Sequence, residues 1–219
     1  MLDFSGFFVL LASLGLSLSA GVRAYLPVLA LGIASHLPSV GGFKVTLLPS
    51  FSWIGEPLFL GLLVLLTVYE ISADKIPVVD HLNDTVHTII RPLSGALIFT
   101  CTSNPLTNSG AAGMVAAAVI GGTIAGTTHV AKAGVVRPAS TLTTAGLANP
   151  LISIAEDILV VFTTVISLLV PVLGALIFVV LAVLVVRGLV TLGKRRQARR
   201  AAAATAATAL PPTTYSGYR

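Results

Sequence analysis

The chain of 219 residues has little charge and a single cysteine. Charged residues make up 10% of it, against roughly a quarter in a soluble domain, whereas 55% of its residues are hydrophobic. Because a water-soluble globule needs far more surface charge, this composition excludes one, and the mean hydropathy of +0.98 agrees. A lone Cys101 also excludes an internal disulfide and a cysteine-based metal cluster.

Signature motifs of enzymes are missing as well. The sequence contains no GxSxG nucleophile elbow, no phosphate-binding P-loop and no HExxH zinc motif. Its glycine-rich stretch at 110–131 is apolar, and glycine in such a segment serves helix packing. We therefore expect no enzymatic activity and no cofactor.

Long apolar stretches are what the chain does have. Six of them reach or approach the length of about 20 residues that crosses a bilayer. The sequence thus predicts an all-α integral membrane protein whose membrane domain covers residues 1–192. The first stretch is too long for one untilted span and contains Gly21, Arg23 and Pro27, so we expect a broken helix or a re-entrant piece plus a span. The six stretches are residues 4–35, 55–76, 85–102, 110–131, 147–169 and 172–192.

Basic residues gather near the C-terminus. Seven of the 13 Lys and Arg residues lie at or after Arg187, so the basic balance reflects a juxtamembrane segment and not nucleic-acid binding. Residues 193–219 read as a basic, low-complexity, disordered cytoplasmic tail. With both termini in the cytoplasm, the inside loops hold Lys75, Lys132 and Arg137, and the outside loops hold only Lys44, which fits the positive-inside rule. This pattern is typical of a multi-pass protein of the bacterial cytoplasmic membrane.

Two weaker patterns concern internal symmetry and assembly. ADKIPVV at 73–79 resembles AEDILVV at 155–161, which is compatible with an inverted pair of three-helix halves. Gly122 and Gly126 form a GxxxG motif, which permits close helix contact and is common in helices that form homo-oligomers.

Half of the chain's eight acids lie between residues 69 and 87, directly after an uncharged run. Glu70 and Asp74 are four residues apart and share one helix face, and Pro77 on nearly the same face frees a backbone carbonyl. Two carboxylates beside a free carbonyl suit a cation or proton site in a helix that stops within the membrane, with Lys75 neutralising part of the charge. Alternatively, the span ends near Tyr69 and these groups lie in water.

Asp80, Asp84 and His87 follow at helical spacing. Carboxylates with an imidazole suit a divalent metal, so these three are weak metal candidates. The alternative is a solvated loop in which Asp84 caps the next helix.

Charges inside apolar helices need partners. Arg91 lies about seven residues into the third segment and should face Glu70 or Asp74. Glu156 and Asp157 should be met by Arg23, Arg91 or Lys132, unless one of them stays protonated. Asn149, before Pro150, repeats the broken-helix pattern of Arg23 without its charge. The predicted substrate or ion site comprises Glu70, Asp74, Arg91, Glu156, Asp157, Arg23, Lys75 and Asn149.

Two stretches carry a family resemblance. GVRAYLPVLALG at 21–32 and YEISADKIPVVDHLNDTVHTIIRPLSGAL at 69–97 resemble a bacterial family of small membrane proteins, the domain-of-unknown-function family numbered 4126, over roughly residues 10–170. The resemblance implies a multi-helix membrane fold and no known activity. Glu70, Asp74 and Lys75 are also faintly similar to the E-x-G-D-K motif of a group of cation/proton exchangers, with one residue more and no glycine.

Together these patterns favour a small transporter or channel for a cation or a proton-coupled substrate. Its expected partners are the lipid bilayer and a small ion or solute. The alternative is a non-transporting scaffold or lipid-handling protein, in which the same charges form structural ion pairs.

Overall fold

The computed structural model describes residues 5–102, 104–133 and 149–177, and single positions between 179 and 194. At 77–82, 84, 149 and 150 it describes the backbone only. The chain divides into two compact units, Met1–Ala182 and Val183–Arg219, and all the helices named below belong to the first. The predicted tail from residue 195 onward lies outside the described residues.

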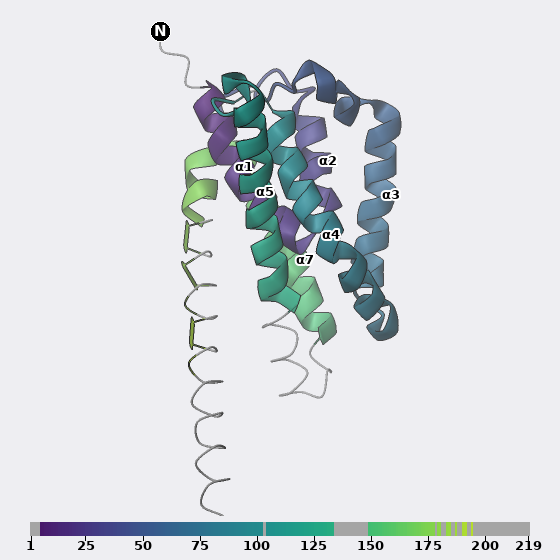
Figure 1. Ribbon diagram of the computed structural model, residues 1–219. Coiled ribbons are helices and arrows are strands. Elements are labelled where there is room, and N and C mark those ends of the chain that lie inside the picture. The colour runs from purple at the N-terminus through teal and green to yellow at the C-terminus, as the bar shows by residue number, and fades with distance from the viewer. Residues whose placement is uncertain are drawn as a thin grey trace, which may run out of the picture. The chain divides into compact units, whose positions relative to one another are not determined.

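The first unit is a bundle of helices, as predicted (Figure 1). Pro57 and Pro77 are the first residues of α3 and α4, where a proline's missing N–H costs no helical hydrogen bond. A further helical stretch begins at Pro171. The elements are α1 (Ser5–Val22), α2 (Tyr25–Ala34), η1 (Pro49–Gly55), α3 (Pro57–Ala73), α4 (Pro77–Cys101), η2 (Thr107–Ser109), α5 (Ala111–Ala131) and α7 (Asn149–Leu169).

The first predicted segment is broken at Arg23 and Ala24, and its two helices run in opposite directions. Gly6, near the start of α1, lies against Pro105 in the connection before α5, and Gly21 lies against the last turns of α5. The end of α2 returns to η1, where the His36 ring contacts the Gly55 carbonyl oxygen at 2.7 Å. The two helices therefore enter and leave the bundle at the same end, as a re-entrant pair.

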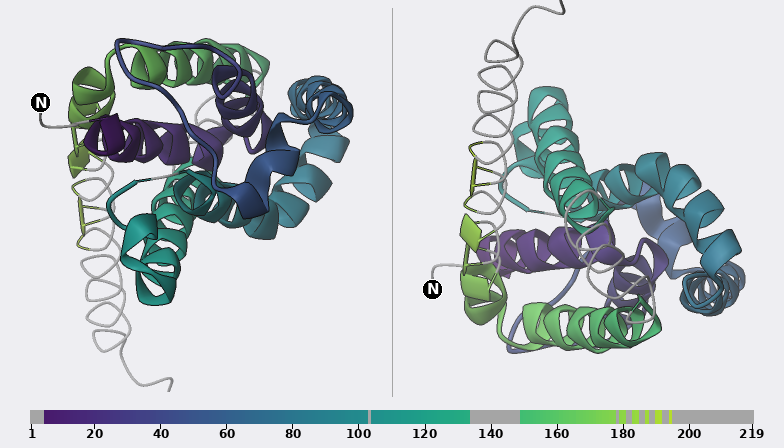
Figure 2. Two further views of the ribbon diagram at one scale, coloured as in Figure 1. Left: turned by 90° about the horizontal axis from the view of Figure 1, so that it is seen from above. Right: turned by 90° about the horizontal axis from the view of Figure 1, so that it is seen from below.

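Helix α1 lies in the middle of the bundle. Seen along the bundle, it has α4 and α5 on one side and α7 on the other (Figure 2). Its 18 residues include many small ones, and Ser17 and Ser19 are fully buried. Ser17 donates to the Gly95 carbonyl of α4 at 3.2 Å, and the Ser19 hydroxyl lies 2.7 Å from that of Thr163 in α7. Such side-chain hydrogen bonds between helices are common where lipid replaces water.

The acidic stretch after Pro77 is not a loop. Helix α4 starts at Pro77 itself, eight residues before the predicted third segment, so the expected solvated loop from Asp80 onward is wrong. Pro77 also does not interrupt a helix: α3 ends at Ala73 and a short turn separates it from α4. Proline at the first helical position initiates a helix, and this preference outweighs the polar composition of the stretch.

Three helices in the described part of the chain are long and apolar enough to cross a membrane: α1, α5 and the Leu151–Leu169 part of α7. The bent pair of η1 and α3 makes a fourth if counted as one span. The predicted six spans are not confirmed. Helix α4 is too polar to be counted among them, α2 has only 10 residues, and the last predicted segment lies partly outside the described residues.

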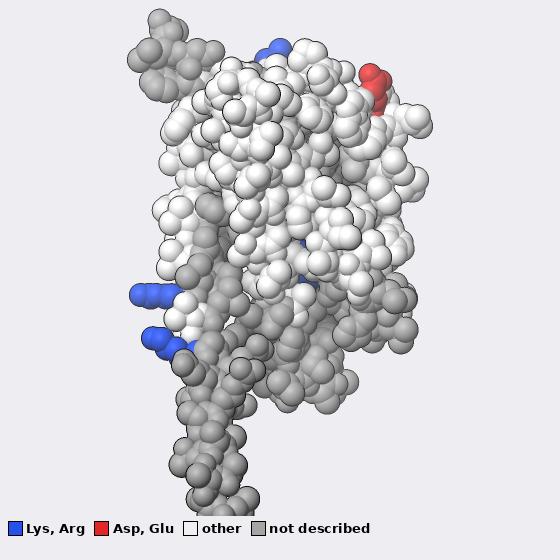
Figure 3. All heavy atoms as spheres, in the orientation of Figure 1, with Lys and Arg blue, Asp and Glu red and all other residues white. Residues whose placement is uncertain are grey.

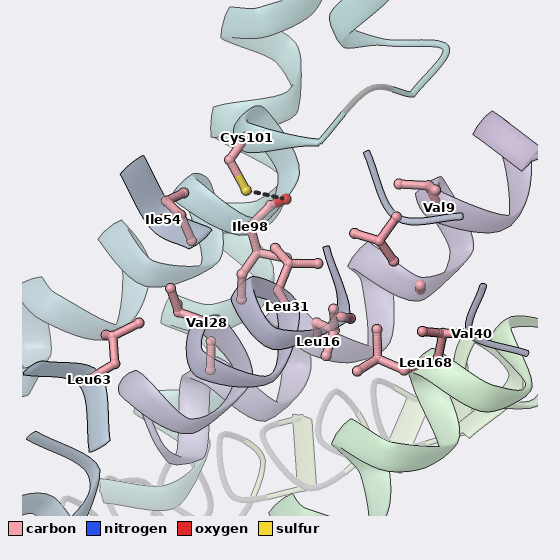
Figure 4. Packing of buried hydrophobic residues seen from close by; sticks show 14 of the residues in the cluster. Val9, Leu16, Val28, Leu31, Val40, Ile54, Leu63, Ile98, Cys101 and Leu168 are labelled. Carbon is pink, nitrogen blue, oxygen red and sulfur yellow. Dashed lines mark hydrogen bonds between the residues drawn. The ribbon is translucent and has the colours of Figure 1, made fainter. Parts of the chain in front are cut away.

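The outer surface of the bundle is apolar. In the face shown in Figure 3, hardly any charge lies over α4 and α5. Large apolar side chains such as Leu58, Leu65, Val115 and Phe162 point outward from α3, α5 and α7. The interior holds its own apolar cluster, in which Leu16, Leu31 and Ile98 pack together and the Cys101 thiol donates to the Ile98 carbonyl (Figure 4). An apolar exterior around an apolar core is the pattern of a protein that a bilayer surrounds.

The small residues of α5 serve packing within the chain. Cβ atoms added at Gly122 and Gly126 would each lie 3.3 Å from Pro92 of α4, so the GxxxG motif faces a neighbouring helix. The closest approach is one residue away, where Gly95 and Gly121 lie backbone to backbone. The proposed sequence repeat gains no support from local structure: 73–79 spans the turn between α3 and α4, whereas 155–161 lies within α7.

Candidate functional site

Arg23 lies at the break between α1 and α2 with 1% of its surface exposed. Its guanidinium contacts two carboxylates and one hydroxyl group, which belong to α7 and to the residue directly after α3. Nε donates to Asp157 Oδ1 at 2.7 Å, Nη2 donates to the Ser153 hydroxyl at 3.1 Å, and Nη1 forms an ion pair with Asp74. The break in the first segment is thus occupied by an arginine that ties α3 and α7 to it.

Glu70 caps the N-terminus of α2. Its carboxylate accepts from the backbone N–H of Ala24 at 2.9 and 3.1 Å and from that of Tyr25 at 3.5 Å. A helix N-terminus carries unsatisfied N–H groups and a partial positive charge, so a carboxylate is stabilised there. Arg91 Nη2 approaches the same carboxylate at 3.4 Å, which confirms the predicted pairing of Arg91 with Glu70.

Asp74 contacts side chains from three other parts of the chain. Besides Arg23, the Lys132 ammonium lies 3.0 Å from Oδ2, and Asn83 donates to Oδ1 at 2.8 Å. Because Asp74 is the residue directly after α3, its side chain reaches the ends of α1 and α5 at once.

Lys132, directly after α5, is held between two carboxylates. Its ammonium lies 3.0 Å from both Asp74 and Glu156, and 3.4 Å from the Val22 carbonyl oxygen. The side chain is 4% exposed, so these groups take the place of water around a full positive charge. Sequence reasoning placed Lys132 only as a partner for the acids of α7, although a lone lysine at the end of an apolar helix is itself a signal.

The network is open to solvent on one side. Lys75 pairs with Asp157 at 3.1 Å, and the two side chains are 39% and 19% exposed. Glu156 is 12% exposed, whereas Arg91 and Glu70 are fully buried. The ion-paired side chains therefore extend from a solvent-accessible edge at Lys75 to the buried interior at Glu70.

Two histidines lie at the inner end. Arg91 Nη1 lies 2.5 Å from His129 Nδ1, and His129 Nε2 lies 3.2 Å from the Thr88 hydroxyl. The His87 Nδ1 lies 2.8 Å from the Asn83 carbonyl oxygen, and Nε2 lies 3.4 Å from Glu70. His129 is not among the predicted site residues, so its contact with Arg91 was missed.

Among the side chains that the structure describes, the formal charges of the ion-paired residues balance. Arg23, Lys75, Arg91 and Lys132 bring four positive charges, and Glu70, Asp74, Glu156 and Asp157 bring four negative ones. These come from three helices, α3, α4 and α7, from the junctions α1–α2 and α3–α4, and from the residue after α5, so the fold gathers seven of the eight predicted site residues. The eighth, Asn149, is the first residue of α7, and its side chain is not described.

The metal prediction finds no support. The described residues hold no group of three or more His, Cys, Asp or Glu that could bind a metal ion. Both ring nitrogens of His87 face Asn83 and Glu70, and the side chains of Asp80 and Asp84 lie outside the described part. At the far end of the bundle, a hollow of about 310 Å³ between Ser35, Lys44 and Glu56 contains none of the predicted site residues.

Comparison with known proteins identifies a family. A family model described as a domain of unknown function, DUF4126, matches residues 10–191. The match confirms the resemblance and extends it past residue 170 through the sixth predicted segment. No curated protein and no solved structure matches the chain.

Proposed function

This chain belongs to the DUF4126 family, whose description assigns no activity, and on that premise we propose that it is a small membrane transporter for a cation or a proton-coupled solute. The observation that carries the proposal is the position of the Lys132 ammonium between Asp74 and Glu156, with a backbone carbonyl nearby. Carboxylate and carbonyl oxygens are also the kind of ligand that a small substrate cation prefers.

The cost of the network supports a functional role. Removing ions from water costs several kcal/mol each, and well-packed apolar side chains of the same volume are often at least as stable. Ionisable residues within membrane segments therefore mark ion pathways and proton relays more often than they mark stability. Eight such residues in a bundle with an apolar exterior exceed what a structural ion pair needs.

In the mechanism that we propose, protonation or a substrate cation competes with Lys132. Either event weakens the hold of Asp74 and Glu156 on the lysine, because one carboxylate cannot fully neutralise two cations. Arg23 shares Asp74 with Lys132, so the change reaches the break between α1 and α2. The accessible edge at Lys75 and Asp157 is the entry, and movement of the re-entrant pair opens the other side.

We further propose an orientation in the bacterial cytoplasmic membrane. Lys75 and Lys132 belong to the end of the bundle that the positive-inside rule assigns to the cytoplasm. Helix α1 begins at the opposite end, so in this orientation Ser5 lies outside (Figure 1). This revises the predicted cytoplasmic N-terminus, which assumed that the first segment crosses the membrane only once.

The test is flux into proteoliposomes that contain the purified protein. Na⁺ and K⁺ uptake and the collapse of an imposed proton gradient are followed with internal dyes. We expect the double variant Glu70→Gln with Glu156→Gln to lose about tenfold or more of the wild-type flux, which corresponds to about 1.4 kcal/mol in the transport barrier. Flux that survives in the double variant removes the proposed site.

A matched control is available at the other end of the bundle. Glu56 is exposed in the connection before α3 and lies outside the network. Glu56→Gln changes the net charge by the same amount as each site substitution and should leave flux unchanged. An equal loss in Glu56→Gln would attribute the effect to charge or reconstitution and not to the site.

The second candidate function is a scaffold or lipid-handling protein held together by these ion pairs. The equal numbers of positive and negative ion-paired groups in the described part of the chain favour it, because a substrate site often carries a net charge. It predicts that Glu70→Arg combined with Arg91→Glu restores folding and phenotype. For a transporter, the swapped pair folds without recovering flux.

A further inference from the structure

The ring of His87 is fixed in one tautomer by its backbone contact. It is 1% exposed, and Nδ1 lies 2.8 Å from the backbone carbonyl oxygen of Asn83, one helical turn earlier. A carbonyl oxygen only accepts hydrogen bonds, so Nδ1 carries a hydrogen and donates it. In the neutral ring, Nε2 is then a bare acceptor.

That acceptor faces another acceptor. Nε2 of His87 lies 3.4 Å from Glu70 Oε1 and has no hydrogen-bond partner within the described part of the chain. An ionised carboxylate also only accepts. Two lone pairs that face each other in a buried place repel, and a buried polar atom without a hydrogen bond costs about 1–3 kcal/mol. One proton between the two atoms removes both costs.

His129 provides a contrast within the same network. Arg91 is a donor only, so its 2.5 Å contact makes His129 Nδ1 an acceptor and places the hydrogen on Nε2, toward the Thr88 hydroxyl. Both nitrogens are satisfied in the neutral ring. Of these two buried histidines, His129 has both ring nitrogens in hydrogen bonds without an extra proton, whereas His87 needs one.

The charged and titratable groups around His87 come from three helices. Burial of the ring and Arg91 of α4 oppose a proton on His87, whereas Glu70 and Asp74 at the end of α3 favour one. The ring of Tyr25 in α2 makes an edge-to-face contact with the imidazole, with 5.6 Å between the two centroids. The carboxylate of Glu70 is the only one of these groups in direct contact with Nε2.

We propose that Glu70 and His87 form a proton-binding pair that holds one exchangeable proton at the start of α2. With the proton on His87, Glu70 is a full carboxylate and accepts from Ala24 and Tyr25; with the proton on Glu70, it is a weaker acceptor for both N–H groups. The position of the proton therefore changes how firmly α2 is anchored. In the proposed transporter, the proton on this pair is the coupling proton. Only this role in coupling rests on the proposed function.

The test observes the ring nitrogens directly, without transport. Full-length protein with ¹⁵N-labelled histidine is placed in lipid nanodiscs, and ¹⁵N chemical shifts are followed from about pH 5 to 8. Infrared difference spectra over the same range report the C=O stretch of a protonated carboxyl group. We expect Nε2 of His87 to take part in a one-proton step, seen as a protonated ring or as a hydrogen bond from a protonated Glu70, while His129 stays neutral throughout.

Two variants isolate the pair. The amide of Glu70→Gln donates to Nε2 without a titrating proton, so His87 should remain neutral across the range. His87→Gln donates to Glu70 in turn and should remove the one-proton step from the infrared spectra. His36→Gln, at the far end of the bundle, serves as the control and should change neither readout. The unchanged His129 signal shows that each variant is folded.

A bare Nε2 on His87 beside an ionised Glu70 at every pH would overturn the pair. So would a wild-type proton step that survives in both site variants. A proton step without any flux in proteoliposomes would keep the pair and remove the transporter. Flux without a proton step would do the reverse.

Discussion

Asp74 links the cation at the break between α1 and α2 to the cation at the end of α5. It contacts Arg23 and Lys132 at once, and its side chain is fully buried. Asp74→Asn keeps the volume but leaves two buried cations with one carboxylate fewer. Breaking a buried pair in this way destabilises proteins by about 3–5 kcal/mol, so we expect a large drop in the free energy of unfolding, measured by thermal denaturation in mild detergent.

Restoring the charge balance should rescue part of this loss. Asp74→Asn combined with Lys132→Met removes one charge of each sign, and methionine fills most of the space of the lysine stem. We expect the double variant to be clearly more stable than Asp74→Asn alone. Glu56→Gln is the control for loss of an exposed acid, and a single Asp74→Asn variant as stable as this control would contradict the account.

At the scale of single residues, several contacts of the site could be predicted from the sequence. An arginine in an apolar helix must find a carboxylate, and Arg91 does contact Glu70. The acids of α7 were expected to meet a basic residue, and Asp157 meets Arg23 while Glu156 meets Lys132. The sequence does not say which partner each one takes, because all candidates carry the same charge. That choice depends on where the helix ends lie in space.

At the scale of the helices, the contact between α4 and α5 rests on two glycines. A Cβ on Gly121 would collide with the Gly95 carbonyl, and one on Gly95 would collide with Gly121 in return. Gly121→Ala should therefore push the helices apart and destabilise the protein by about 1–3 kcal/mol. The measurement is again thermal unfolding in detergent.

Matched glycines make this prediction specific. Gly122, next along the same helix, leaves 3.3 Å to the nearest atom and should tolerate alanine better than Gly121. Gly61 in α3 has nothing within 4 Å, so Gly61→Ala should be neutral or stabilising by up to about 1 kcal/mol through helix propensity. Equal effects at Gly121 and Gly61 would show that close packing is not the cause.

The helices also show where sequence patterns stop being informative. Apolar length located α5 and α7 to within two residues, because lipid requires a minimum number of apolar residues. Hydropathy has no direction, so the prediction of a break near Arg23 left open whether the chain continues across the membrane or turns back. Nor did it predict α4 from Pro77: the polar composition indicated a loop, whereas the contacts of Asn83 with Asp74 and of His87 and Arg91 with Glu70 favour a helix there.

For the molecule as a whole, the proposed orientation in the membrane depends on the return of α2. The start of α1 and the loop that contains Lys44 lie at one end of the bundle, and the turn between α3 and α4, which contains Lys75, lies at the other (Figure 1). A single crossing by residues 4–35 would instead place Ser5 and Lys75 on the same side. The side of the N-terminus therefore distinguishes the re-entrant pair from a continuous span.

Labelling of intact cells with a membrane-impermeant maleimide measures this directly. In a Cys101→Ser background, we expect Lys44→Cys to react in intact cells and Ile76→Cys, which is exposed beside Lys75, to react only after permeabilisation. A peptide tag fused before residue 1 should be accessible to antibody in intact cells, together with Lys44→Cys. A tag protected like Ile76→Cys would mean that the first segment crosses the membrane once, and the anchoring of α2 by Glu70 would then need a different geometry.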